Sequence, residues 1–167
     1  VSRDTIILLT NASYSVHATL LISTDRGETW EKRTAAVSLN GGSFDFVNSK
    51  IGYATGGERY TPNYGIFKTI DGGITWQLVY SIATTDDIVT LKFYDANFGY
   101  AYRSSVGMLK TTDGGATWTS STLIDRIFSI SFVNPSTAYA VGDHGVVYKT
   151  TDAGVNWVWT SPGSRIY

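Results

Sequence analysis

The sequence has no cysteine, only 3 prolines among 167 residues, and no long uninterrupted apolar run. The absence of cysteine excludes disulfides and thiolate metal sites. A helix that crosses a membrane needs roughly 20 consecutive apolar residues. No stretch approaches that length, so we expect no membrane-spanning segment. No signal peptide stands in the numbered chain, which we interpret as a mature form or a fragment.

A surplus of charge is also missing, because 13 basic and 14 acidic residues leave a net charge of −1. Proteins that bind nucleic acid electrostatically carry a basic surplus, so we expect no nucleic-acid partner. Glycine is abundant, at 17 residues, as are aromatic residues, at 14%. This composition is typical of a folded, turn-rich chain, and the length suits one domain with a substantial core.

One eight-residue unit occurs four times, with the common form S/T-x-D-x-G-x-x-W. Its aspartates stand at positions 25, 71, 113 and 152, so the intervals are 46, 42 and 39 residues. A period in this range, with strand-like sequence between the units, is typical of propeller blades. The copies are STDRGETW (23–30), TIDGGITW (69–76), TTDGGATW (111–118) and TTDAGVNW (150–157).

The chemistry of the unit predicts a hairpin turn pinned to a core. The aspartate can accept hydrogen bonds from backbone N–H groups of its own turn. The invariant glycine can adopt a positive φ at little steric cost, and the tryptophan can bury a large apolar ring. The unit resembles the Asp-box, or bacterial neuraminidase repeat, in which these residues are structural. The structural residues are Asp25, Gly27, Trp30, Asp71, Gly73, Trp76, Asp113, Gly115, Trp118, Asp152, Gly154 and Trp157.

The sequence between the units predicts short antiparallel strands joined by turns. In the last repeat the expected strands are 126–133, 137–141, 146–149 and 156–160. Four such strands make one propeller blade. We therefore predict an all-β protein, a β-propeller of four-stranded antiparallel blades. It forms one domain, 1–167, with repeats at about 1–42, 43–87, 88–126 and 127–167.

Two assemblies fit four repeats. The chain could close as a four-bladed ring, or it could be part of a larger propeller of six to eight blades. Repeat arrays need capped ends, and no polar capping segment stands at either end. We favour the larger propeller.

A longer repeat extends beyond the box, with the form G-Y-A-x-G-x-x-G-x-I/V-x-K-T-T-D-G-G-x-T-W. It is clearest in 93–118 and 132–157. This repeat resembles the propeller family of photosystem II stability/assembly factors and their bacterial relatives. The resemblance implies an exported protein, in a periplasmic, cell-surface or thylakoid-lumen-like compartment. It also implies a noncatalytic scaffold that binds a protein partner or a membrane-protein complex.

No arrangement of residues identifies an enzyme, a cofactor site or a metal site. A sialidase needs clustered arginines, whereas the arginines of this chain are scattered over all repeats. An inverting glycosidase needs two carboxylates roughly 6.5–9.5 Å apart, which the sequence cannot pair. For Asp86 and Asp87 we expect two solvated turn residues. Neither histidine, His17 or His144, has a metal-ligand spacing. The alternative function is a glycan-binding or glycoside-hydrolase module, by analogy with other Asp-box propellers.

Candidate binding residues lie in the loops between the second and third strands and at the starts of first strands. The second repeat has an insertion of about six residues in this loop, and functional residues are often added in such loops. The arginines at first-strand starts could line the same end of the blades. The candidates are Arg59, Tyr60, Tyr64, Arg103, Arg126, Asp143, His144 and Arg165.

Overall fold

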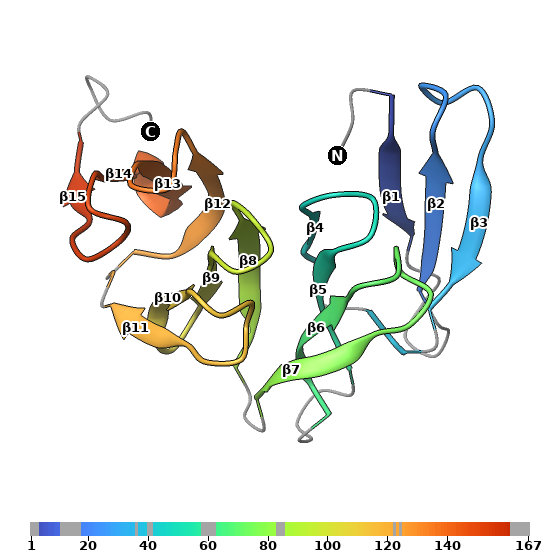
Figure 1. Cartoon of the computed structure of the whole chain (residues 1–167). Coiled ribbons are helices and arrows are strands. Elements are labelled where there is room, and N and C mark those ends of the chain that lie inside the picture. The colour runs from blue at the N-terminus through green and yellow to red at the C-terminus, as the bar shows by residue number, and fades with distance from the viewer. Residues whose placement is uncertain are drawn as a thin grey trace. The chain divides into compact units, whose positions relative to one another are not determined.

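The computed structural model describes residues 4–10, 18–35, 37–39, 42–57, 63–82, 86–121, 123 and 125–160. In these residues the regular structure consists of β-strands and one 3-10 turn, η1 (Asp143–Gly145). The strands form four antiparallel sheets, in which strands that follow one another in the chain are paired (Figure 1). This confirms the predicted all-β architecture of consecutive antiparallel blades.

The chain divides into two compact units, Val1–Thr85 and Asp86–Tyr167, with two sheets in each. In the first unit, one sheet has the order β1-β2-β3 and the other β4-β5-β6-β7. Their bounds are β1 (Ile6–Thr10), β2 (Thr19–Ser23), β3 (Glu31–Thr34), β4 (Phe44–Phe46), β5 (Gly52–Gly56), β6 (Gly65–Thr69) and β7 (Gln77–Ser81).

The second unit holds the sheets β8-β9-β10-β11 and β12-β13-β14-β15. The strands of the last sheet lie within one or two residues of the predicted ranges. The bounds are β8 (Ile88–Phe93), β9 (Gly99–Arg103), β10 (Gly107–Thr111), β11 (Thr119–Ser121), β12 (Ile127–Phe132), β13 (Ala138–Gly142), β14 (Val147–Thr150) and β15 (Val158–Trp159).

The first sheet has three strands in the described residues, and these correspond to the second, third and fourth strands of the other sheets. The N–H of Arg26 donates to the carbonyl of Asp4 over 3.0 Å, just as the N–H of Ala153 donates to Ser136 over 2.9 Å. The strand β1 of the first sheet therefore corresponds to β13 of the fourth sheet, the second strand of its blade. Four-stranded blades are thus present in three of the four sheets.

The four Asp-boxes form the same hydrogen-bonded clasp. In each, the first-position hydroxyl donates to the aspartate over 2.7–2.9 Å and accepts from the glycine N–H over 2.7–2.9 Å. The backbone N–H four residues after the aspartate donates to its carboxylate over 2.9 Å. The glycines Gly27, Gly73, Gly115 and Gly154 all have positive φ, from 79° to 95°. The boxes therefore have the predicted structural role.

Each unit has its own apolar core between its two sheets. In the first unit Leu20 and Phe67 are buried together with Trp76, whose ring meets Phe46 edge-on at 6.0 Å. In the second unit Tyr100 is fully buried and stacks on Phe132, with ring centroids 5.2 Å apart. Since Tyr100 and Phe132 belong to neighbouring sheets, Tyr100 packs between two blades there.

Candidate functional site

The candidate site lies in the second unit, where the turns after β9 and β13 meet the segments that precede β8 and β12. The N–H of Ser104 donates to the carbonyl of Asp87 over 3.1 Å. At the equivalent place, the N–H of Asp143 donates to the carbonyl of Arg126 over 2.9 Å. Both sheets thus bring their second-to-third turn against the start of their own first strand. The polar residues gathered here, Asp86, Tyr102, Arg103, Asp125, Arg126 and Asp143, are called the loop-end cluster below.

A shielded ion pair anchors the third sheet's part of the cluster. The Arg103 Nε lies 2.6 Å from Asp86 Oδ2, and the two side chains are only 15% and 7% exposed. The same carboxylate accepts from the Ser104 hydroxyl at 2.5 Å, from the Ser105 N–H at 3.1 Å and from the Ser105 hydroxyl. Burial alone would raise the pKa of Asp86, but these serine and arginine donors outweigh it and hold the pKa below its usual value.

One expectation from the sequence is corrected by this geometry, because Asp86 is a shielded, multiply hydrogen-bonded carboxylate and not a solvated turn residue. The Nε of Arg103 donates to that carboxylate and so holds the β9–β10 turn, while a role of Arg103 in binding stays a prediction. The sequence missed this pairing because 17 residues separate the partners, and only the β8–β9 register places them together.

Tyr102, on β9, is buried beside the charged residues of the cluster and is 3% exposed. Burial is the largest cause that raises the pKa of Tyr102, and the charges of Asp125, Asp86 and Asp143 raise it further, while Arg126 lowers it. These charges therefore act on one phenol. Beside it, the Tyr148 hydroxyl donates to Asp125 over 2.7 Å, which raises the pKa of Tyr148.

The exposed part of the cluster belongs to the fourth sheet. Arg126 is exposed, and its guanidinium lies over the ring of Phe128 at 5.4 Å, a cation–π arrangement. Phe128 is itself 47% exposed. His144 is exposed in η1 with φ of 58°, a left-handed conformation that few residues other than glycine adopt. The predicted residues Arg126, Asp143 and His144 therefore lie near one another at this end of the sheet.

The other predicted binding residues do not join the loop-end cluster. Tyr64 belongs to the first unit and is 1% exposed, so its side chain offers no surface to a partner. Arg59, Tyr60 and Arg165 lie outside the described residues. Tyr102, Asp125 and Tyr148 were not predicted as binding residues. The alternation in Tyr100-Ala101-Tyr102, which points Tyr102 to the same side as Tyr100, was the available signal.

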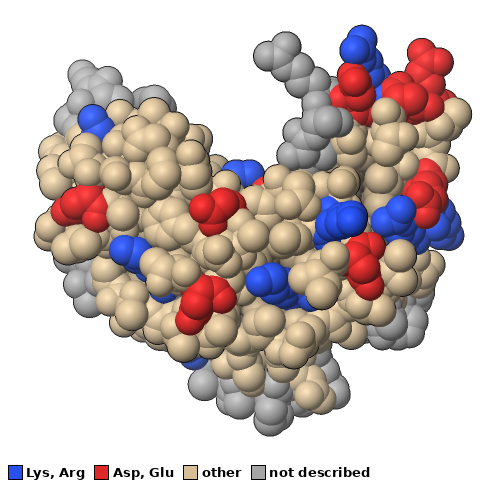
Figure 2. Space-filling model, in the orientation of Figure 1, with Lys and Arg blue, Asp and Glu red and all other residues tan. Residues whose placement is uncertain are grey.

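The cluster offers recognition groups more clearly than catalytic ones. A glycosidase acid needs a raised pKa, and the pKa of Asp86 is lowered. Across the described ranges, no group of three or more histidine, aspartate or glutamate side chains could hold a metal ion. On the face shown in Figure 2, basic and acidic side chains are interspersed and form no large area of one sign. No helix of the described residues has the length and apolar character needed to cross a membrane.

The blade-like sheets and the repeated clasp define an Asp-box β-propeller. A family model described as BNR/Asp-box repeat matches residues 21–32, the first copy of the unit. The model described as Photosynthesis system II assembly factor YCF48 matches residues 43–161, and the chain belongs to that family. No curated protein matches the sequence.

Solved structures support the same fold. The GH74 enzyme of Niastella koreensis aligns with 97% of this chain and 29% of its own, with a TM-score of 0.74 and 23% identity. A structure of YCF48 bound to D1 peptide aligns with 75% of this chain and 42% of its own, with a TM-score of 0.60 and 23% identity. The GH74 xyloglucanase of Xanthomonas campestris covers 95% of this chain and 29% of its own, with a TM-score of 0.68 and 17% identity.

At these identities the likeness concerns the fold alone. The chain spans between 29% and 42% of the length of these structures. The number of blades in the propeller to which this chain belongs stays a prediction.

Proposed function

We propose that this protein is a noncatalytic propeller scaffold that binds a polypeptide partner and acts in the assembly of an extracytoplasmic complex. Membership of the assembly-factor family over residues 43–161 supports the scaffold role. The related YCF48 structure contains a D1 peptide, which makes a polypeptide the first partner to test.

The observation that carries the proposal is the exposed Arg126–Phe128 pair in the loop-end cluster. Arginine and aromatic residues dominate the binding energy of protein interfaces, because they bury much area and make oriented contacts at modest entropic cost. The shielded Asp86–Arg103 pair supports the neighbouring turn and keeps its conformation before a partner arrives. A preformed surface loses less conformational entropy on binding.

A binding titration of the whole chain with fluorescently labelled D1 peptide tests the proposal. The double variant Arg126→Glu/Phe128→Ala should weaken binding at least tenfold, because it removes both the charge and the ring. Lys32→Glu changes an exposed charge by the same amount on β3 of the other unit and should leave the affinity unchanged. Equal affinity in all three proteins would remove the loop-end cluster as the docking surface.

One observation favours the glycan-acting alternative. The fold of this chain aligns with that of a GH74 enzyme with a TM-score of 0.74. The lowered pKa of Asp86 speaks against that residue as a general acid. Incubation with xyloglucan separates the two proposals. If the parent protein turns over xyloglucan and Asp143→Asn does not, the protein is a hydrolase and the scaffold proposal is wrong.

A further inference from the structure

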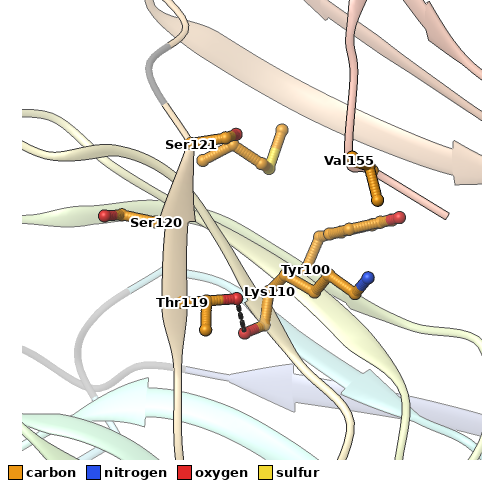
Figure 3. Close-up of a pocket in the computed structure, with 8 residues that line it drawn as sticks. Tyr100, Lys110, Thr119, Ser120, Ser121 and Val155 are labelled. Carbon is orange, nitrogen blue, oxygen red and sulfur yellow. Dashed lines mark hydrogen bonds between the residues drawn. The ribbon is translucent and has the colours of Figure 1, made fainter. Parts of the chain in front are cut away.

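A pocket of about 180 Å³ lies in the second unit between the third sheet and the Asp-box turn of the fourth. It shares no residue with the loop-end cluster. Figure 3 shows its polar side chains: the Tyr100 hydroxyl and the Lys110 amine extend in the same direction, toward the segment that carries Val155. Thr119 and Ser121 face the same side of β11, and Ser120 points the other way.

The Tyr100 hydroxyl at this pocket is buried and has no hydrogen-bond partner among the described residues. Its ring cannot easily turn away, since it stacks on Phe132 and meets Trp157 edge-on at 5.3 Å. Burial raises the pKa of Tyr100, and the charge of Asp152 adds to the rise, so the phenol stays protonated and able to donate. A buried donor without an acceptor is unfavourable, and a ligand oxygen would satisfy it.

Lys110 brings a positive charge to the same pocket. Within the described ranges, no carboxylate lies at ion-pair distance from it, and its Nζ lies 5.8 Å from the Phe98 ring centroid. The Thr119 hydroxyl donates to the Lys110 carbonyl. Asp152, whose charge acts on Tyr100, accepts hydrogen bonds from Thr150 and Asn156 of its own box and forms no ion pair with Lys110. Among the described residues the pocket therefore presents hydroxyl donors and one cation without an ion-pair partner.

A pocket in the first unit is lined in part by the corresponding positions and contains its own ion pair. It has a volume of about 150 Å³ and is lined by Glu31 and Arg33 on β3. Arg33 donates to both Glu31 oxygens, over 2.7 and 2.9 Å. Counting from the box tryptophans, Thr119 holds the place of Glu31 and Ser121 that of Arg33. The second pocket therefore lacks the acid that the first one supplies to its own cation.

We propose that the pocket around Lys110 is a binding site for a carboxylate group. The ammonium of Lys110 would pair with the carboxylate, and the hydroxyls of Ser121 and Tyr100 would donate to its oxygens. A single cation balances one negative charge, which a carboxylate carries at neutral pH. The volume limits the occupant to a small acid, an acidic side chain or a chain terminus, which share this chemistry.

Three capped peptides distinguish the sources: Ac-Gly-Glu-Gly-NH2, Ac-Gly-Gly-Gly-OH and Ac-Gly-Gln-Gly-NH2, with acetate as the free acid. Binding to the whole chain is followed by NMR shifts of the amides of residues 110 and 121. We expect saturation with carboxylate probes and none with the glutamine peptide. Saturation by acetate alone would assign the site to a free acid. If no carboxylate probe saturates the shifts, the proposal is wrong.

Variants locate the binding. Lys110→Gln should weaken carboxylate binding at least tenfold. Lys149→Gln removes the corresponding lysine of the fourth sheet, whose Nζ lies 5.6 Å from the Tyr139 ring centroid, and should change nothing. Thr119→Glu/Ser121→Arg copies the neutralised first pocket and should abolish binding in a folded protein. Tyr100→Phe should weaken binding without lowering the melting temperature. Equal effects of Lys110→Gln and Lys149→Gln would overturn the assignment.

Discussion

At the scale of single residues, the residue after each box aspartate adopts a left-handed backbone conformation. Its φ is 63° at Arg26, 74° at Gly72, 71° at Gly114 and 56° at Ala153. Glycine adopts this conformation freely, whereas for residues with a Cβ it costs about 1–2 kcal/mol. Two of the four boxes therefore contain backbone strain that the other two avoid.

Replacing Ala153 by glycine should relieve that strain. We expect Ala153→Gly to raise the free energy of unfolding by about 1 kcal/mol, since the gain in the turn exceeds the added entropy of the unfolded chain. Urea denaturation measures the change. Ala116→Gly, two residues further along the third box and outside the left-handed region, serves as the control and should lower stability slightly. A loss of stability in Ala153→Gly would contradict the strain argument.

The box aspartates should make stability depend on acidity. Hydrogen bonds from the residue four positions later are the largest cause that lowers the pKa of Asp25, Asp71, Asp113 and Asp152 to about 2, from 3.8. A carboxyl whose folded-state pKa is depressed contributes stability that is present above its unfolded pKa. This contribution is lost as the pH falls through the range from about 4 to 2.

Asp113→Asn tests this dependence. At pH 7 the variant should be less stable than the parent, and the difference should shrink as the pH falls from 4 to 2, in urea titrations at each pH. Asp95→Asn is the matched control, because Asn48 and Asn134 hold the equivalent turn position and accept the same N–H bonds as Asp95. If the difference in unfolding free energy between Asp113→Asn and the parent stays constant down to pH 2, the lowered pKa of Asp113 does not contribute to stability.

At the scale of elements, a phenylalanine at the end of the first strand covers a glycine at the start of the second. A Cβ on Gly99 would lie 2.6 Å from Phe93 Cδ1, and one on Gly52 would lie 2.7 Å from the ring of Phe46. Phe93 then meets Trp118 edge-on at 6.1 Å. In the fourth sheet Ala138 replaces the glycine, and Phe132 stacks on Tyr100.

This packing predicts the effect of Gly99→Ala. The added methyl overlaps the Phe93 ring, and overpacking of this kind costs about 1–3 kcal/mol. The melting temperature should therefore fall. Ala138→Gly is the reciprocal change at the equivalent position and should cost only the chain entropy of a strand glycine, about 0.5–1 kcal/mol. Similar losses of stability in both variants would show that the Phe93 ring is not the reason why position 99 needs glycine.

At the scale of the whole molecule, the charges are balanced and mixed. The net charge is −1, and the face in Figure 2 carries interspersed signs. Binding to duplex DNA requires several lysines or arginines on one surface to displace counterions. We expect no saturable binding to duplex DNA at about 0.15 M salt, measured by a gel-shift titration. Saturable, salt-dependent binding would contradict the expectation.

Repetition of a local motif is what the sequence alone could determine. The S/T-x-D-x-G-x-x-W spacing predicts the clasp, the hairpin and the order of the strands, because all the partners in each box lie within eight residues. The structural role of the boxes and the antiparallel sheets followed from this local chemistry. The grouping of Arg126, Asp143 and His144 followed from the repeat register.

The tertiary structure decided what depends on contacts between distant residues. It pairs Asp86 with Arg103, 17 positions away in the sequence, and it buries Tyr64. It also leaves the Tyr100 hydroxyl, near Lys110, without a hydrogen-bond partner among the described residues. The repeat gives the two pockets some corresponding lining positions, but their charge balance depends on which side chains face each other. Strand register and side-chain burial set those pairings, and neither is a property of a short stretch of sequence.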